Sequence, residues 1–310
     1  MSKIRILDKV LDLQLTGAAT QHLRTFATRI GTTGADRQPT THTMIIRGDR
    51  PPRLTVDSSV RTIYLDLPSV NGVSGGMLTM EIAVLQAATR SVAAMNASDP
   101  PLLHGGAITL DGGATAMAVL DGGLGQGKTS LAMGLARLGG HLLVDEFTFS
   151  TFDDSAVRVV PMPSLPWHVR ADMAALLATG ATGGLLYHDD VDSLIFDGTE
   201  AIPVEVIVVP DRSLPPGQIR RVSAAQSRHL LRAAVTDHDA KLRDPRLDHV
   251  SIFTSPQQID VRTTTVPNTD STAPVLERLS AVPTLRVGIG GPADLPETID
   301  AIIQWQFGSK

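Results

Sequence analysis

The chain lacks several features that would define whole classes of protein. Its 310 residues contain no cysteine, which excludes disulfides, thiolate metal sites and cysteine nucleophiles. Aromatic residues make up only 4% and the formal net charge is −5, so neither a base-stacking platform nor a basic field for nucleic acid is expected. The sequence contains no apolar run of about 18 residues, the length that a membrane-spanning helix needs. Near the N-terminus, Asp8 and Lys9 interrupt the apolar core that a signal peptide would have. We therefore expect a cytoplasmic protein with no membrane or nucleic-acid partner.

What is present is typical of a globular chain, with 42% hydrophobic and 19% charged residues. The best candidate for a domain boundary is Ser98-Asp99-Pro100-Pro101, because two prolines cannot continue a helix. We therefore predict an N-terminal α+β region at 1–100 and a larger α/β domain at 101–310.

The pattern of apolar residues predicts the elements of both regions. In the first region we expect strands at 3–7, 42–47 and 60–67 and helices at 17–30 and 79–95. In the second region we expect strands at 102–110, 114–120, 141–144, 194–196, 205–209 and 285–287, and helices at 130–138, 223–234 and 294–305.

One motif stands out between a predicted strand and a predicted helix. Residues 122–129 match the phosphate-binding pattern G-x-x-x-x-G-K-[ST], and they are Gly122, Gly123, Leu124, Gly125, Gln126, Gly127, Lys128 and Thr129. Glycines let successive backbone N–H groups curl around an oxyanion, and the following helix, which begins near Ser130, adds its positive end. Lys128 is expected to neutralise the β and γ oxygens of ATP, and the Thr129 hydroxyl to bind Mg²⁺.

A pair of carboxylates follows the next predicted strand. Asp145 and Glu146 come directly after the apolar residues 142–144, where a phosphate-loop protein carries the acid that holds Mg²⁺. Two adjacent acids suit phosphoryl transfer to a hydroxyl, because one can accept a proton while the other holds the metal. A surface turn after a buried strand is the alternative interpretation.

Several segments of the second region together resemble the HPr kinase/phosphorylase-like kinases. They are Leu103-His104-Gly105-Gly106-Ala107, Leu110-Asp111-Gly112-Gly113, the phosphate loop, and Gly139-Gly140-His141-Leu142-Leu143-Val144-Asp145-Glu146. Asp145 lies seventeen residues after Lys128, the spacing of that family's first acid. The resemblance implies a phosphate-loop core with a mixed, antiparallel-rich sheet, like that of HPr kinase and phosphoenolpyruvate carboxykinase. It also makes a homo-oligomer possible, because members of the family commonly form symmetric assemblies.

The resemblance assigns roles residue by residue. Asp145 would be the general base toward the acceptor hydroxyl, Glu146 would support Mg²⁺, and His104 would lie near the acids and the γ-phosphate. The chain departs from the family in three ways. Glu146 replaces an Asp, the hairpin after His104 is longer, and the charged signature that recognises HPr is missing. These departures imply a divergent relative that acts on another acceptor.

Other segments carry weaker signals. His168 and Arg170 could present cations to the acceptor, although a surface loop anchored by Trp167 explains them equally well. The polar run 187–192 is interpreted as a solvated turn. Gly288–Gly291 lacks the strand-before-helix spacing of a dinucleotide-binding loop.

The leading hypothesis is an ATP- and Mg²⁺-dependent kinase that phosphorylates a hydroxyl on a protein, a peptide or a small metabolite. The alternative is a regulatory protein that senses the nucleotide without transferring phosphate. Chemistry of the phosphoenolpyruvate carboxykinase type would need further metal ligands and an arginine set that the sequence does not offer.

Overall fold

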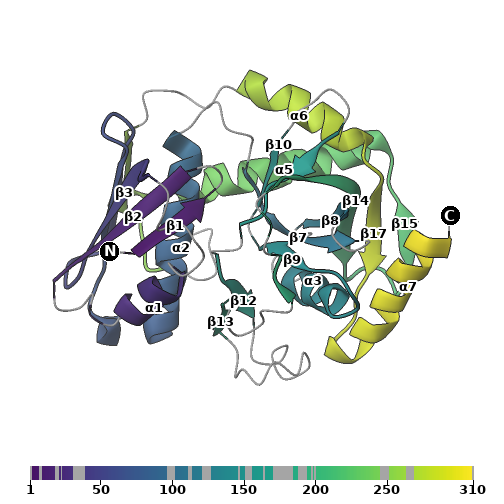
Figure 1. Ribbon diagram of the computed structural model, residues 1–310, viewed down its shortest axis with the longest axis horizontal. Helices are drawn as coiled ribbons and strands as arrows, with labels where there is room; N and C mark the ends of the chain where they lie inside the picture. Colours follow the sequence, from purple (N-terminus) through teal and green to yellow (C-terminus); the bar gives the residue numbers. More distant parts are fainter. Residues whose placement is uncertain are drawn as a thin grey trace. The chain divides into compact units, whose positions relative to one another are not determined.

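The chain divides into two compact units, each described by itself below. Unit 1 comprises Met1–Asp99 and Thr236–Ser271, and unit 2 comprises Pro100–Val235 and Thr272–Lys310. The computed structural model (Figure 1) describes residues 2–6, 9–17, 21, 23–30, 39–95, 102–110, 114–120, 127–145, 147–150, 156–162, 165–169, 184–187, 194–196, 198, 200–244, 251–262 and 269–308. The sequence pattern had placed 236–271 with the second region, whereas the structure groups this segment with the first.

Unit 1 is built on a six-stranded mixed sheet with the order β1-β2-β3-β5-β4-β16. Its strands are β1 (Ser2–Ile6), β2 (Lys9–Thr16), β3 (His42–Arg47), β4 (Arg53–Asp57), β5 (Thr62–Asp66) and β16 (Ile259–Arg262). The last strand pairs with β4 in parallel, with Ile259 opposite Leu54. This pairing explains why a segment far along the chain belongs to unit 1.

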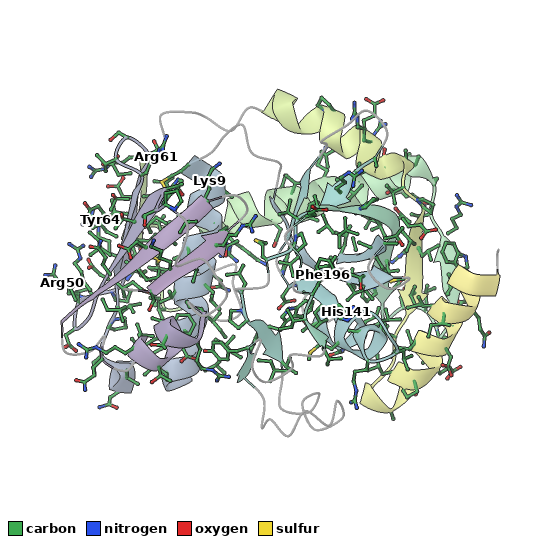
Figure 2. The ribbon with its side chains drawn as sticks, in the orientation of Figure 1. Lys9, Arg50, Arg61, Tyr64, His141 and Phe196 are labelled. Atoms are coloured by element: carbon green, nitrogen blue, oxygen red, sulfur yellow. The ribbon has the colours of Figure 1, made fainter. Side chains whose placement is uncertain are left out.

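One face of this sheet is apolar, because alternate residues of its strands point the same way. Met44, Ile46, Ile63 and Leu65 are almost fully buried. Helices α1 (Leu23–Ile30) and α2 (Gly76–Met95) pack on the sheet, α1 against β1 and β2 and α2 against β4 and β5. The other face is polar. Arg47 bonds Asp66 through two nitrogens and lies over the ring of Tyr64, which is labelled in Figure 2.

Unit 2 is built on a nine-stranded mixed sheet. Its strands are β6 (Leu102–Leu103), β7 (Gly105–Leu110), β8 (Thr115–Leu120), β9 (Leu142–Val144), β10 (Phe147–Ser150), β11 (Arg158–Val159), β14 (Ile202–Asp211), β15 (Ile219–Arg221) and β17 (Thr284–Gly288). The strands β8, β14 and β17 are mutually parallel, and the remaining pairs are antiparallel. A separate two-stranded sheet joins β12 (Trp167–Val169) to β13 (Gly184–Leu186).

Four helices complete the described part of the chain: α3 (Lys128–Ala136), α5 (Ala224–Arg243), α6 (Thr269–Ala281) and α7 (Leu295–Gly308). Short 3-10 turns occur at Val70–Gly72, Pro256–Gln258 and Pro292–Asp294. Helix α3 packs against α7, and the two lie side by side in Figure 1. Their apolar residues share one core with β8, β14 and β17, which buries Leu131, Val206, Leu285 and Ile302. Within the described residues, no helix is long and apolar enough to cross a membrane.

The predicted α/β class with a mixed sheet is confirmed, but several predicted elements differ from those observed. The strand expected at 102–110 is two strands, because His104 donates its backbone N–H to Ala234 O instead of continuing the ladder. The strand expected at 194–196 is a single bridge between Leu142 and Ile195. Helix α5 extends to Arg243, nine residues beyond the expected end at Ala234. The likeness to HPr kinase stays a prediction.

Candidate functional site

The candidate phosphate loop leads from β8 into α3. Strand β8 ends at Leu120, and α3 begins at Lys128. Gly122, Gly123, Leu124, Gly125 and Gln126 lie outside the described residues. The description resumes at Gly127, and Lys128, Thr129 and Ser130 form the start of the helix, all half-buried. The first N–H groups of a helix have no partner within the helix, so this end can donate hydrogen bonds to an anion.

Gly127 occupies a position where the backbone demands glycine. Its φ of 80° and ψ of 20° are left-handed, a region that costs a residue with a Cβ about 1–2 kcal/mol. A Cβ built on Gly127 would also lie only 3.1 Å from Ile289 Cδ1, in the loop after β17. Both observations explain why the loop closes on a glycine just before the lysine.

The central contact of the site joins α3 to the end of β9. The Thr129 hydroxyl donates a hydrogen bond to Asp145 Oδ1 at 3.0 Å. Strand β9 is antiparallel to β7, which is antiparallel to β8, so β9 and β8 run in the same direction. Their carboxyl ends therefore meet at one edge of the sheet. This topology brings together two residues that are sixteen positions apart in the chain.

Asp145 has a second contact, on its other oxygen. The backbone N–H of His168 in β12 points to Asp145 Oδ2 at 3.5 Å, the long limit of a hydrogen bond. The neighbouring Trp167 is 1% exposed, and its ring packs against Gly106. A Cβ built on Gly106 would lie 3.5 Å from that ring. Asp145 thus links the start of α3 to β12. Arg170, the other predicted substrate residue, lies outside the described residues.

His104 lies between β6 and β7, at the same edge of the sheet. Its neighbour Gly105 pairs with Leu120, the last residue of β8 before the candidate phosphate loop. Its backbone N–H donates to Ala234 O of α5 at 3.2 Å. The sheet register therefore brings His104 to the carboxyl end of β8. A role for its imidazole in catalysis remains a prediction.

Strand β9 is fixed at its beginning by a small polar and aromatic cluster. The backbone N–H of His141 donates to Thr109 Oγ1 at 2.9 Å, and Phe196 N donates to Leu142 O at 3.0 Å. The rings of His141 and Phe196, both labelled in Figure 2, meet edge to face with centroids 6.5 Å apart. Sequence patterns did not identify this cluster, although Gly140 signals a close approach, because a Cβ there would meet Thr109 O at 2.7 Å.

The arrangement of Thr129 and Asp145 fits a magnesium ion in part. Neighbouring ligands of an octahedral Mg²⁺, each about 2.1 Å from the metal, lie about 3 Å apart, and the two side-chain oxygens are 3.0 Å apart. The described residues contain no cluster of three His, Asp or Glu that could hold a metal unaided. A metal here would need phosphate oxygens and water, as Mg²⁺ usually does. Glu146, the second predicted ligand, lies outside the described residues.

A second glycine loop lies against the first. Gly288–Gly291 follows β17 and leads through the 3-10 turn Pro292–Asp294 into α7, so it lies between a strand and a helix, both of which the sequence pattern predicted. A backbone N–H of this loop that could bind an external anion instead binds a carboxylate of the chain, because Gly291 N donates to Asp294 Oδ2 at 2.7 Å. A Cβ on Gly288 would come within 1.8 Å of Pro215 O, so close packing explains this glycine. The loop therefore resembles a self-capped turn.

Comparison with known proteins adds no family to these observations. A scan against protein-family models finds no match, and a search of curated proteins also finds none.

Proposed function

We propose that the chain is an ATP-dependent, Mg²⁺-requiring kinase that transfers the γ-phosphate to a hydroxyl of a protein, a peptide or a small metabolite. The observation that carries the proposal is the hydrogen bond from Thr129 to Asp145. It joins the predicted metal-binding hydroxyl of the phosphate loop to the acid expected after the next strand.

The start of α3 supports binding of a triphosphate. Gly127 turns the backbone so that the first N–H groups of the helix face outward along its axis. Lys128 follows directly, and its ammonium would neutralise the β and γ oxygens. A helix end and a flexible cation together attract a polyphosphate more strongly than either alone, because both act on the same charge.

Thr129 and Asp145 would hold Mg²⁺, which when bound supplies charge neutralisation on the transferring phosphoryl group. Asp145 was also predicted to be the general base. Its two oxygens face Thr129 Oγ1 and His168 N, so the contacts favour the metal side over the acceptor side. On this assignment the acceptor's proton goes to a different group, and Glu146, the other acid of the pair, is the candidate from the sequence.

The experiment measures nucleotide binding and turnover separately. Titration calorimetry of ATP with and without Mg²⁺ is expected to give tighter binding with the metal, and Asp145→Asn is expected to remove this gain while Mg²⁺-free binding persists. ADP release is then followed with protein extracts, hydroxy amino acids and sugars as acceptors. A kinase releases ADP only with its acceptor, whereas a nucleotide sensor shows binding and no acceptor-dependent release. Absence of ATP binding would reject both functions.

A further inference from the structure

The positive charge of unit 2 is concentrated in one segment. Residues 212–235 contain five arginines and no Asp or Glu, although the whole chain carries a net charge of −5. All five are exposed: Arg212, Arg220, Arg221, Arg228 and Arg232. They follow β14, lie in β15 and lie in the first turns of α5. The segregation is along the chain, and in space Glu297 of α7 packs against Gly217 of the same segment, 3.2 Å from where a Cβ on that glycine would stand.

A sixth arginine joins this group through the sheet. Arg286 of β17 is directly opposite Arg220 of the antiparallel strand β15. Like charges in directly opposite positions destabilise a sheet, so this pair costs stability unless something compensates it. Within the described residues, Asp211 compensates this pair in part, because its Oδ2 lies 2.7 Å from Arg286 Nη2.

Asp211 holds Arg286 of this group in place through an ion pair. It is 7% exposed, and its Oδ1 accepts from Ser213 N at 2.9 Å and from Ser213 Oγ at 2.7 Å. Burial raises the pKa of Asp211, but the Ser213 hydrogen bonds and the charges of Arg286 and Arg220 outweigh it and hold the pKa below 3.8. The carboxylate therefore stays ionised at neutral pH and fixes Arg286, whose side chain remains 47% exposed.

We propose that Arg212, Arg220, Arg221 and Arg286, called the arginine surface below, bind an acidic segment of a polypeptide. A guanidinium has five N–H donors, and one carboxylate contact uses at most two of them, so Arg286 keeps donors for a ligand. Arg220 and Arg221 point to opposite faces of β15, which pairs only with β17 among the described residues. An extended acidic chain along this edge would meet both.

A polypeptide fits this surface better than a nucleic acid. No Phe, Tyr or Trp occurs in residues 212–235, so bases would find no ring on which to stack. Planar guanidinium groups match carboxylates in two-point contacts, which Glu and Asp side chains supply. Basic residues on an edge strand also prevent sheets from joining edge to edge, and the test below separates this explanation from binding.

Arg212 follows the carboxyl end of β14, at the end of the sheet where β8 leads into the candidate phosphate loop, whereas Arg220, Arg221 and Arg286 lie along β15 and β17. Strands β8, β14 and β17 are parallel, so Leu120, Asp211 and Gly288 all lie at that end of the sheet. Two strand spacings, about 10 Å, separate β17 from β8. The proposal goes beyond phosphotransfer and does not depend on it, because its test needs no nucleotide.

The test is fluorescence anisotropy of a labelled peptide of alternating Glu and Ser, titrated with the full chain at about 0.1 M salt. The double variant Arg220→Gln, Arg221→Gln would lose two exposed ion pairs with the peptide, so we expect it to bind about five- to tenfold more weakly. This double variant leaves the ion pair between Asp211 and Arg286 intact. The matched control, Arg24→Gln with Arg50→Gln, removes the same charge from exposed positions of unit 1 and is expected to stay within about twofold.

Any of four results would overturn the proposal. One is an equal loss in both double variants, which would indicate a general charge effect. Another is the absence of peptide binding by the unaltered chain, and the third is tighter binding of an oligothymidylate of equal charge. If the arginines only protect the β15 edge, the Arg220→Gln, Arg221→Gln variant associates with itself in sedimentation and leaves peptide affinity unchanged.

Discussion

The two glycine loops of unit 2 lie at equivalent places in the fold, but one is followed by a cation and the other by a carboxylate. Each follows a strand of the same parallel set, β8 or β17, and each precedes a helix, α3 or α7. They touch where Ile289 meets Gly127. In the loop before α7, the carboxylate of Asp294 accepts a hydrogen bond from the loop's own Gly291 N. The loop before α3 instead supplies Lys128 and a hydroxyl bonded to Asp145.

This difference shows that a strand, a glycine turn and a helix do not make an anion site by themselves. The backbone N–H groups of the turn must also be free of a carboxylate from the chain, and a cation must lie close by. On this view the α3 loop takes the phosphates and the α7 loop supports it. The following predictions test that division.

The largest effect is expected for Lys128→Ala. Removing the only cation of the motif should lower turnover by about three orders of magnitude, as loss of other cations that clamp a transferring phosphoryl group does. Steady-state ADP release measures it, and thermal unfolding checks that the variant is folded. Full turnover in a folded Lys128→Ala protein would contradict the assignment of this loop.

Asp145→Asn is expected to lower turnover about a hundredfold, in the range for one lost electrostatic contact in an active site. If Asp145 holds the metal, the variant also needs more Mg²⁺ for half-maximal turnover. A Mg²⁺ titration of the rate decides this. An unchanged Mg²⁺ requirement with the same loss of rate would return Asp145 to the role of general base.

Gly127→Ala tests the turn into α3. A Cβ in a left-handed conformation costs about 1–2 kcal/mol of stability, and Ile289 crowds the added methyl group. Urea unfolding of Gly127→Ala and of Gly127→Ala with Ile289→Ala separates the two causes, because the second substitution relieves only the crowding. Equal stability of Gly127→Ala and the unaltered protein would contradict the observed backbone conformation.

Asp294→Ala tests the second loop. It removes the hydrogen bond that Gly291 N donates to Asp294, and loss of one hydrogen bond costs about 1 kcal/mol, so we expect a modest fall in the free energy of unfolding. ATP affinity should not change, which calorimetry measures directly. A marked loss of ATP binding in this variant would show that the α7 loop takes part in nucleotide binding. It would contradict the claim that only the α3 loop binds the phosphates.

The smallest effect concerns Asp211, at the end of the strand between the two loops. Its pKa is held below 3.8 in the folded chain, because the Ser213 hydrogen bonds and nearby arginines outweigh the opposing effect of burial. The stabilisation is therefore present above the unfolded pKa and is lost as the pH falls through the folded value. Asp211→Asn should flatten the dependence of unfolding free energy on pH below about 4.

The sequence predicted elements whose burial is local and periodic. Strand 42–47 matches the observed β3, since Met44 and Ile46 alternate with half-buried residues. Helix α2 and strand β8 are close to the expected bounds. Strand β2 was missed, although Leu11, Leu13 and Leu15 alternate in it. Helix α6 was missed as well, because it contains Pro274 and depends on buried Leu276 and Leu279.

Contacts between distant parts of the chain could not be predicted from local patterns. The pairing of β16 with β4 brings Ser58 to Arg262, 204 residues away. One contact between predicted site residues could be expected from the sequence, because the spacing after the motif suggests it. Thr129 and Asp145 were each predicted near the metal, and they share a hydrogen bond. The contact of Ile289 with Gly127 depends on β17 lying two strands from β8, which no motif encodes.

Hydrogen–deuterium exchange with and without MgATP tests the central claim most directly. If the α3 loop holds the phosphates, MgATP slows amide exchange in peptides covering residues 122–131 and leaves those covering 290–298 unchanged, and Lys128→Ala removes the protection. Protection at the start of α7, or ATP binding without protection at the start of α3, would contradict the account.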